Sequence, residues 1–270
     1  MKNKILLIAL LFSSLFISSC KKEISEPSFV DTPIIQSFLT VGSPATVNVS
    51  KLTAFDPNAQ YSNDNVAALN IKITFGDSVH TLNSIGGGNY VDSSLIINDS
   101  TQYSLQFNYN SKPVTATTKA LSKPTGYTQS VTDINMTQIP VGGSSFGITL
   151  PDNIIFNWTN NDHSYYIMVV QNIEINPELI NLNESTADQN RLFRNEPIQD
   201  ITTQLRPRQF HYYGMHKIIL YHILSDYADL YKSDGTSSQN LTTPSTNIFN
   251  GLGIFTAMNS ATLYINVHKI

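Results

Sequence analysis

The sequence has little charge and almost no cysteine, and each shortage excludes a class of protein. Only 13% of its 270 residues are charged while 41% are hydrophobic, so the chain can bury a core and is not intrinsically disordered. Alanine and glutamate are scarce, which excludes a coiled coil or a helical repeat. The net charge is −4, and such a chain lacks the clustered basic residues that binding to nucleic acid needs. This length predicts one or two domains.

The single cysteine, Cys20, follows the most apolar stretch of the chain. The apolar run over residues 5–17 is shorter than the about 20 residues that span a membrane, and it suits an export signal. Residues 17–20, Ile-Ser-Ser-Cys, resemble the bacterial lipobox. That resemblance implies that residues 1–19 form a lipoprotein signal peptide and that Cys20 becomes an acylated N-terminus, carrying a fatty acid such as palmitate. The alternative is a plain signal peptide in which the cysteine is coincidental.

Cleavage before Cys20 has consequences for charge, chemistry and place. It removes Lys2 and Lys4, leaving 14 basic against 20 acidic residues, and it leaves no cysteine for a disulfide, a nucleophile or a metal site. Residues 20–32 then form a tether. No Asp follows the cysteine, so the inner-membrane retention signal of some enteric lipoproteins is missing, and the short charged stretch is similar to the surface-export signal of Bacteroidota lipoproteins. We expect a lipid-anchored protein of the outer membrane, with the leaflet left open.

Alternation of apolar and polar residues recurs along the rest of the chain and predicts half-buried β-strands. Such runs cover residues 45–50, 71–75, 103–109 and 263–268. Three glycines and an asparagine at 86–89 accept positive φ angles and predict a hairpin.

Two further runs, 165–170 and 218–221, are apolar on both faces, which predicts strands covered on each side. The only expected helix is short, from Asp226 to Lys232. Residues 182–203 lack steady periodicity and are expected to form a long excursion.

The predicted fold class is therefore mainly β, with two tandem β-sandwich domains and one short helix. A boundary near 123–127, the predicted linker, separates a first sandwich at 33–122 from a second at 128–270.

Several short motifs resemble known modules. In the first domain, the segments 71–73, 88–90 and 102–105 look like immunoglobulin-like modules of secreted bacterial proteins. In the second, residues 154–158 and 164–167 are similar to the B and C strands of a fibronectin type III sandwich, with Trp158 as its core tryptophan.

The chain as a whole resembles a Bacteroidota lipoprotein family that is classified only as a domain of unknown function. The ending Gly-Leu-Gly-Ile-Phe at 251–255 carries this resemblance, together with the lipobox and the Tyr-Tyr strand. It implies an outer-membrane lipoprotein found alongside TonB-dependent transporters, and it supplies no catalytic residues.

No metal, cofactor or catalytic pattern emerges from the sequence. His216 and His222 have no metal-ligand spacing, and on one strand they would lie about 20 Å apart. Asp162-His163-Ser164 holds triad residue types, but neighbours on an extended chain point to opposite faces, so a turn is the favoured interpretation. The acidic and amide residues at 56–65 are interpreted as a turn rather than a calcium loop.

The aromatic residues Phe210, Tyr212 and Tyr213 are the candidate binding residues, because aromatic side chains anchor sugars and protein partners. The alternative is that all three belong to the core. We expect a non-enzymatic accessory protein whose contact region joins residues 182–203 to this aromatic cluster. A structural or adhesion module of the envelope is the alternative, and a hydrolase whose site assembles only in space is a third.

Overall fold

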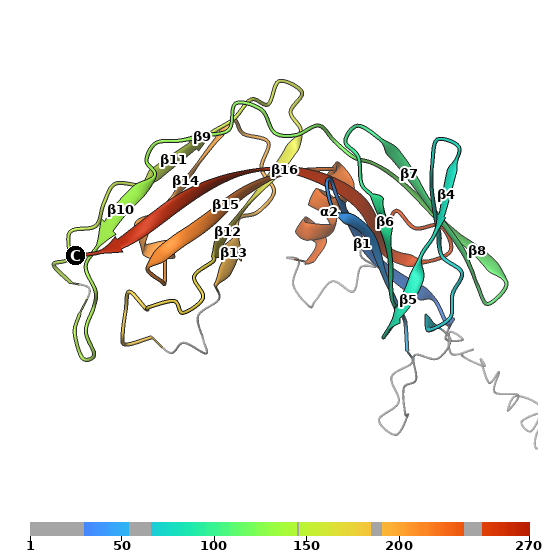
Figure 1. Cartoon of the computed structure of the whole chain (residues 1–270), viewed down its shortest axis with the longest axis horizontal. Coiled ribbons are helices and arrows are strands. Elements are labelled where there is room, and N and C mark those ends of the chain that lie inside the picture. Colours follow the sequence, from blue (N-terminus) through green and yellow to red (C-terminus); the bar gives the residue numbers. More distant parts are fainter. Residues whose placement is uncertain (1–29, 54–65, 145, 185–190, 235–244) are drawn as a thin grey trace, which may run out of the picture. The chain divides into compact units, whose positions relative to one another are not determined.

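β-Strands dominate the part of the chain that the computed structural model describes, which is residues 30–53, 66–144, 146–184, 191–234 and 245–270 (Figure 1). In these ranges there is one α-helix, α2 (Ser225–Asp234), and the short 3-10 turn η3 (Pro207–Gln209) precedes β15. No helix there is both long and apolar enough to span a lipid bilayer. The prediction of a mainly β fold with one short helix is confirmed.

The first core lies between two sheets. One contains β5, β6, β2 and β1 in that order, and the other is ordered β4-β3-β7-β8. The bounds are β1 (Pro33–Thr40), β2 (Pro44–Lys51), β3 (Lys72–Phe75), β4 (Ser78–Thr81), β5 (Asn83–Gly86), β6 (Asn89–Ile96), β7 (Gln102–Tyr109) and β8 (Lys112–Lys119).

The predicted alternation decides which side chains of β7 enter this core. Tyr103, Leu105, Phe107 and Tyr109 are all buried, and the residues between them face outward. The predicted hairpin at 86–89 joins β5 to β6, and Gly86 to Gly88 all have positive φ angles. Both predictions are confirmed.

The second core also lies between two sheets. A small sheet is ordered β14-β11-β9 and faces β13-β12-β15-β16, with β10 paired to the far end of β16. The bounds are β9 (Thr128–Gln129), β10 (Asp133–Met136), β11 (Ile154–Asn157), β12 (Tyr165–Asn172), β13 (Leu192–Arg194), β14 (Thr202–Leu205), β15 (Gly214–Ile223) and β16 (Leu252–Lys269). Trp158 is buried in this core, as the resemblance implies.

Strands β12 and β15 are covered on both faces, as their continuous apolar runs predict. On one face Met168 and Leu220 enter the second core. On the other, Ile167 and Ile223 pack with Ala228 of α2. The helix therefore buries an apolar surface that would otherwise face water.

Strand β16 belongs to both sandwiches. Residues 252–258 pair in parallel with β1, and residues 259–267 pair antiparallel with β15. Phe255 and Ala257 accordingly lie in the first core, together with Ile248. The sequence suggested a terminal strand only over 263–268, and the predicted domain limits gave all of 128–270 to the second sandwich. In the structure, residues 248–258 instead pack in the first sandwich. Residues Thr32–Ile270 form one compact unit.

The excursion at 182–203 also differs from expectation. Within its described residues the structure contains β13 and the start of β14, which pair with β12 and β11. Strands of three or four residues are too short for periodicity to reveal them.

Candidate functional site

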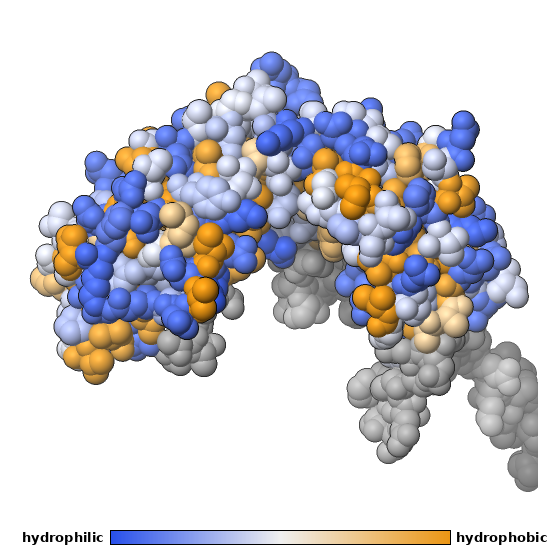
Figure 2. Space-filling model, viewed as in Figure 1, coloured by the Kyte–Doolittle hydropathy of each residue, from blue (hydrophilic) through white to orange (hydrophobic). Residues whose placement is uncertain are grey.

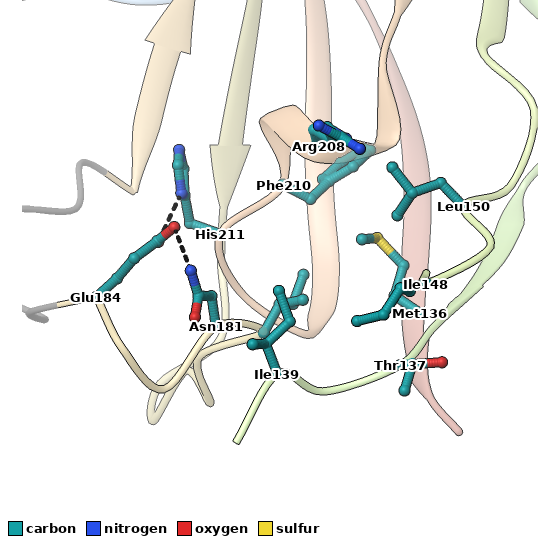
Figure 3. A pocket seen from close by; sticks show the side chains of 11 residues that line it. Met136, Thr137, Ile139, Ile148, Leu150, Asn181, Glu184, Arg208, Phe210 and His211 are labelled. Carbon is teal, nitrogen blue, oxygen red and sulfur yellow. Dashed lines mark hydrogen bonds and ion pairs between the residues drawn. The ribbon is translucent and has the colours of Figure 1, made fainter. Parts of the chain in front are cut away.

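A pocket of about 200 Å³ opens beside the end of β10 (Figure 3). It forms where three segments far apart in the sequence meet: the end of β10 with the chain after it, residues 180–184, and η3 with the chain after it. Its lining residues are Met136, Thr137, Ile139, Ile148, Leu150, Ile180, Asn181, Glu184, Arg208, Phe210 and His211.

Backbone hydrogen bonds hold these three segments together. The Ile139 amide donates to the Ile180 carbonyl at 2.8 Å, and the Leu182 amide returns a bond to the Ile139 carbonyl at 2.9 Å. The Ile180 amide donates to the carbonyl of His211 at 2.9 Å. Beyond the end of β10, the pocket walls are therefore held by main-chain hydrogen bonds between segments that form no regular sheet.

The wall of the pocket is mainly apolar and rests on the second core. Met136, Ile180 and Phe210 are buried members of that core. The Phe210 ring meets the ring of His216 edge to face, with centroids 4.8 Å apart. Such packing fixes the Phe210 ring and leaves a firm surface toward the pocket.

A carboxylate with engaged oxygens lies at one edge of the pocket. One oxygen of Glu184 is 3.1 Å from Nδ1 of His211, and the other accepts from the Asn181 amide at 3.0 Å (Figure 3). The Asn181 side-chain oxygen accepts in turn from the backbone amide of Asn183 at 3.1 Å. The acceptor groups at this edge are therefore engaged within the protein itself.

Arg208 lies at another edge, beside Phe210 (Figure 3). The η3 turn brings its side chain there, and the residue is exposed. No hydrogen bond or ion pair joins its guanidinium group to any other residue in the described ranges. Arg208 is thus a cation at the pocket edge with unused donors.

The loop after β10 also presents apolar side chains to solvent. Val141 is 79% exposed and Phe146 is 95% exposed. Figure 2 shows apolar surface at the tip of this loop, at the lower left. Asn183 binds the loop to the pocket edge, because its side chain accepts from the Gly142 amide at 2.7 Å and donates to the Pro140 carbonyl at 3.0 Å.

The structure buries the aromatic residues that the sequence singled out. Phe210, Tyr212 and Tyr213 are 3%, 4% and 6% exposed, which favours the alternative that they belong to the core. The Tyr213 hydroxyl donates to the Met136 carbonyl at 3.1 Å, so this ring supports the pocket from behind. Of the three, only Phe210 lines the pocket.

The pocket nevertheless joins the two segments predicted to form a contact region. Glu184 comes from the excursion, and Phe210 and His211 come from the aromatic cluster. Sequence reasoning missed Ile139, Ile148 and Leu150, which lie on a glycine-rich loop. Apolar residues on a loop with no periodicity were the signal that could have identified them.

The remaining chemistry expected from the sequence has simple structural explanations. Asp162 to Ser164 lie in the turn before β12, where the Ser164 hydroxyl donates to the Asp162 carboxylate at 2.8 Å, so the turn interpretation is confirmed. His216 and His222 are buried in β15. Within the described ranges no group of three or more His, Cys, Asp or Glu side chains could hold a metal ion. Cys20 and the segment 56–65 lie outside the described residues.

The fold and the site define a strand-rich protein with a small, mainly apolar pocket. The chain belongs to the family described as Domain of unknown function (DUF4249), whose model matches residues 23–263. A search of curated proteins found no match.

Similarity to solved structures is distant. The chicken CNTN1 FN1-FN3 domains are 14% identical with a TM-score of 0.26, and the match covers 72% of this chain and 59% of that one. The DIP-gamma IG1+IG2 structure is 7% identical with a TM-score of 0.20, covering 87% of this chain and 97% of that one. The trypsin-activated alpha-2-macroglobulin from Escherichia coli is 9% identical with a TM-score of 0.21, covering 73% and 15%. The family model identifies no enzyme, and these structural similarities assign no function.

Proposed function

We propose that this chain is a lipid-anchored accessory protein of the outer membrane that binds a ligand or a protein partner through the pocket beside β10. The pocket is the observation that carries the binding proposal, because it has an apolar wall, main-chain edges held by hydrogen bonds, and a cation, Arg208, that has no partner among the described residues. The anchor and the partnership with a TonB-dependent transporter rest on the lipobox-like sequence before Cys20 and on the resemblance that accompanies it.

Binding is favoured over catalysis by the composition of the pocket. Glu184 is the only carboxylate among the described lining residues, so these residues do not assemble the carboxylate pair of a glycosidase. Among the described lining residues there is no serine or cysteine that the Glu184–His211 pair could activate, and the one hydroxyl, that of Thr137, makes no hydrogen bond to either member of that pair.

The anchor is tested by mass spectrometry of the protein purified from bacterial membranes. We expect an N-terminus at Cys20 that carries acyl chains, and we expect the Cys20→Ser variant to leave the membrane fraction. An unmodified thiol, or a start at another residue, contradicts the anchor.

The binding role is tested by closing the pocket. Ile148→Trp replaces an aliphatic side chain of the lining with a larger aromatic one. Ile175→Trp makes the same change at a residue that is 90% exposed and outside the lining. We expect the first variant, but not the second, to lose the transporter that co-purifies with the wild-type protein from solubilised membranes. Equal recovery with both variants contradicts a role for the pocket.

A structural or adhesion role is the second candidate, and the exposed side chains of Val141 and Phe146 favour it. Changing both residues to Ser leaves the pocket lining intact and removes apolar surface from the loop. Loss of partner recovery in this double variant, with normal recovery in Ile148→Trp, would assign the contact to the loop surface.

A further inference from the structure

The two charged side chains at the pocket, Glu184 and Arg208, differ in how many of their polar groups already have partners in the protein. Both oxygens of Glu184, the one carboxylate among the described lining residues, already have partners in Asn181 and His211. In Figure 3 the rest of the His211 ring points away from the apolar wall. Arg208 has no hydrogen-bond or ion-pair partner within the described part of the chain, so its guanidinium donors remain for an occupant of the pocket.

The size of the pocket limits the occupant. A cavity of about 150 Å³ with apolar walls holds benzene, whereas pockets for drug-sized ligands have volumes of about 300–1,000 Å³. At about 200 Å³ this pocket suits one aromatic ring or a short aliphatic chain. Met136, Ile180 and Phe210 supply the apolar contacts for such a group.

We infer that the pocket binds a small apolar carboxylate, with its apolar group against Phe210 and Met136 and its carboxylate on Arg208. This inference rests on the proposed binding function and names the chemical class of the ligand. A guanidinium group pairs with a carboxylate through charge-assisted hydrogen bonds, which also fix the orientation of the ligand. A cationic ligand would lie against the like charge of Arg208, so the geometry disfavours it.

A series of three probes with one apolar body tests this inference. 4-Phenylbutyrate, 4-phenylbutanol and 4-phenylbutylamine are anionic, neutral and cationic and share the same ring and chain. Their dissociation constants are measured by calorimetry on the full-length protein in lipid nanodiscs. Ile148→Trp serves as the blank, because it closes the pocket but leaves partitioning into lipid unchanged.

We expect the carboxylate to bind about three- to tenfold more tightly than the alcohol, as one exposed charge-assisted contact provides. Arg208→Gln should abolish this preference and leave binding of the alcohol unchanged. Arg206→Gln is the matched control, since it removes an exposed arginine of the same segment that lies outside the lining. Glu184→Gln should leave carboxylate binding equal or tighter, because it removes a like charge.

Three results would overturn the inference. They are an amine that binds as tightly as the carboxylate, equal effects of Arg206→Gln and Arg208→Gln, and no binding of any probe beyond the Ile148→Trp blank. None of these contradicts a role of the pocket in partner binding, which fails separately if closing the pocket leaves recovery of the transporter unchanged. Because Arg208 is exposed, its replacement perturbs charge without disturbing the core.

Discussion

At the residue scale, the structure explains the second glycine of the Gly-Leu-Gly-Ile-Phe ending, Gly253. Its φ angle is +92°, and a Cβ atom built there would lie 2.0 Å from the Ile35 carbonyl oxygen. Gly253 pairs with Ile35 where β16 meets β1. The position therefore excludes a side chain for two independent reasons, the backbone conformation and the contact.

Replacing Gly253 by Ala should lower the free energy of unfolding by roughly 3 kcal/mol, since strain at a positive φ angle and a backbone clash add. Gly42→Ala is the matched control, because its φ angle is +82° and no atom lies within 4 Å of the place that a Cβ atom would take. Urea denaturation measures both variants. A loss at Gly253 no larger than that at Gly42 would show that the contact with Ile35 adds nothing.

His216 illustrates how burial alone makes one side chain sensitive to pH. Burial lowers the pKa of His216 from 6.5 to about 4. One ring nitrogen lies 3.0 Å from the Gly214 carbonyl oxygen and the other 3.3 Å from the Asn172 amide nitrogen. The hydrogen bond with the Gly214 carbonyl and the charge of Glu174 both oppose the shift, but the desolvation of the ring outweighs them.

The free energy of unfolding should therefore fall as the pH drops from about 6.5 toward 4. In this range His216 is protonated in the unfolded chain but stays neutral in the folded chain. The contribution of His216 to this fall is up to about 3 kcal/mol. It is measured as the difference in unfolding free energy between the two pH values for the wild type and for His216→Asn. His163→Asn, at an exposed residue, is the control and should keep the wild-type slope. Equal slopes in the wild type and in His216→Asn would exclude this histidine as the source.

At the element scale, strand β16 changes its neighbour at Asn259. Pairing with β1 ends at Met258, and pairing with β15 begins at Asn259. The buried Asn259 side chain donates to the Leu121 carbonyl at 3.0 Å, and His222 lies 2.9 Å from the Ser122 carbonyl. Two neighbouring side chains of the sheet thus hold the connection between the cores.

Asn259→Ala should cost about 1–3 kcal/mol of unfolding free energy, because it leaves the Leu121 carbonyl without its donor. Asn266→Ala, on the same strand, is the control, since its side chain makes no hydrogen bond within the described part of the chain. Thermal unfolding measures both. Equal melting temperatures for the two variants would mean that water replaces the Asn259 amide at no cost.

At the scale of the whole molecule, β16 connects the two cores through one continuous backbone. Phe255 lies in the first core and Ile265 in the second. A defect in the first part of the strand should therefore weaken the second sandwich as well.

The single tryptophan makes this testable, since Trp158 lies in the second core and reports its unfolding by fluorescence. Gly253 pairs with Ile35, a residue of the first core. We expect Gly253→Ala to lower the midpoint of the Trp158 fluorescence transition together with that of the far-ultraviolet circular dichroism transition. A fluorescence midpoint that stays at the wild-type value while the dichroism signal shifts would show that the sandwiches unfold independently.

The N-terminal segment belongs to the same scale, and its role remains a prediction from sequence. Cys20 precedes the described residues, so the proposed lipid anchor rests on the lipobox-like pattern and on the family resemblance. The proposed place of the protein depends on that one side chain.

The sequence by itself determined which residues face inward on β7, the hairpin at 86–89 and the helix that begins beside Asp226. These features follow from local periodicity, turn chemistry and side-chain polarity, each of which acts over a few neighbouring residues. Only the tertiary structure decided that β16 serves both cores, that Phe210, Tyr212 and Tyr213 are buried, and that Ile148, Glu184 and Arg208 meet around one pocket. These features depend on contacts between residues far apart along the chain, and no local pattern records which partner a strand or loop will find.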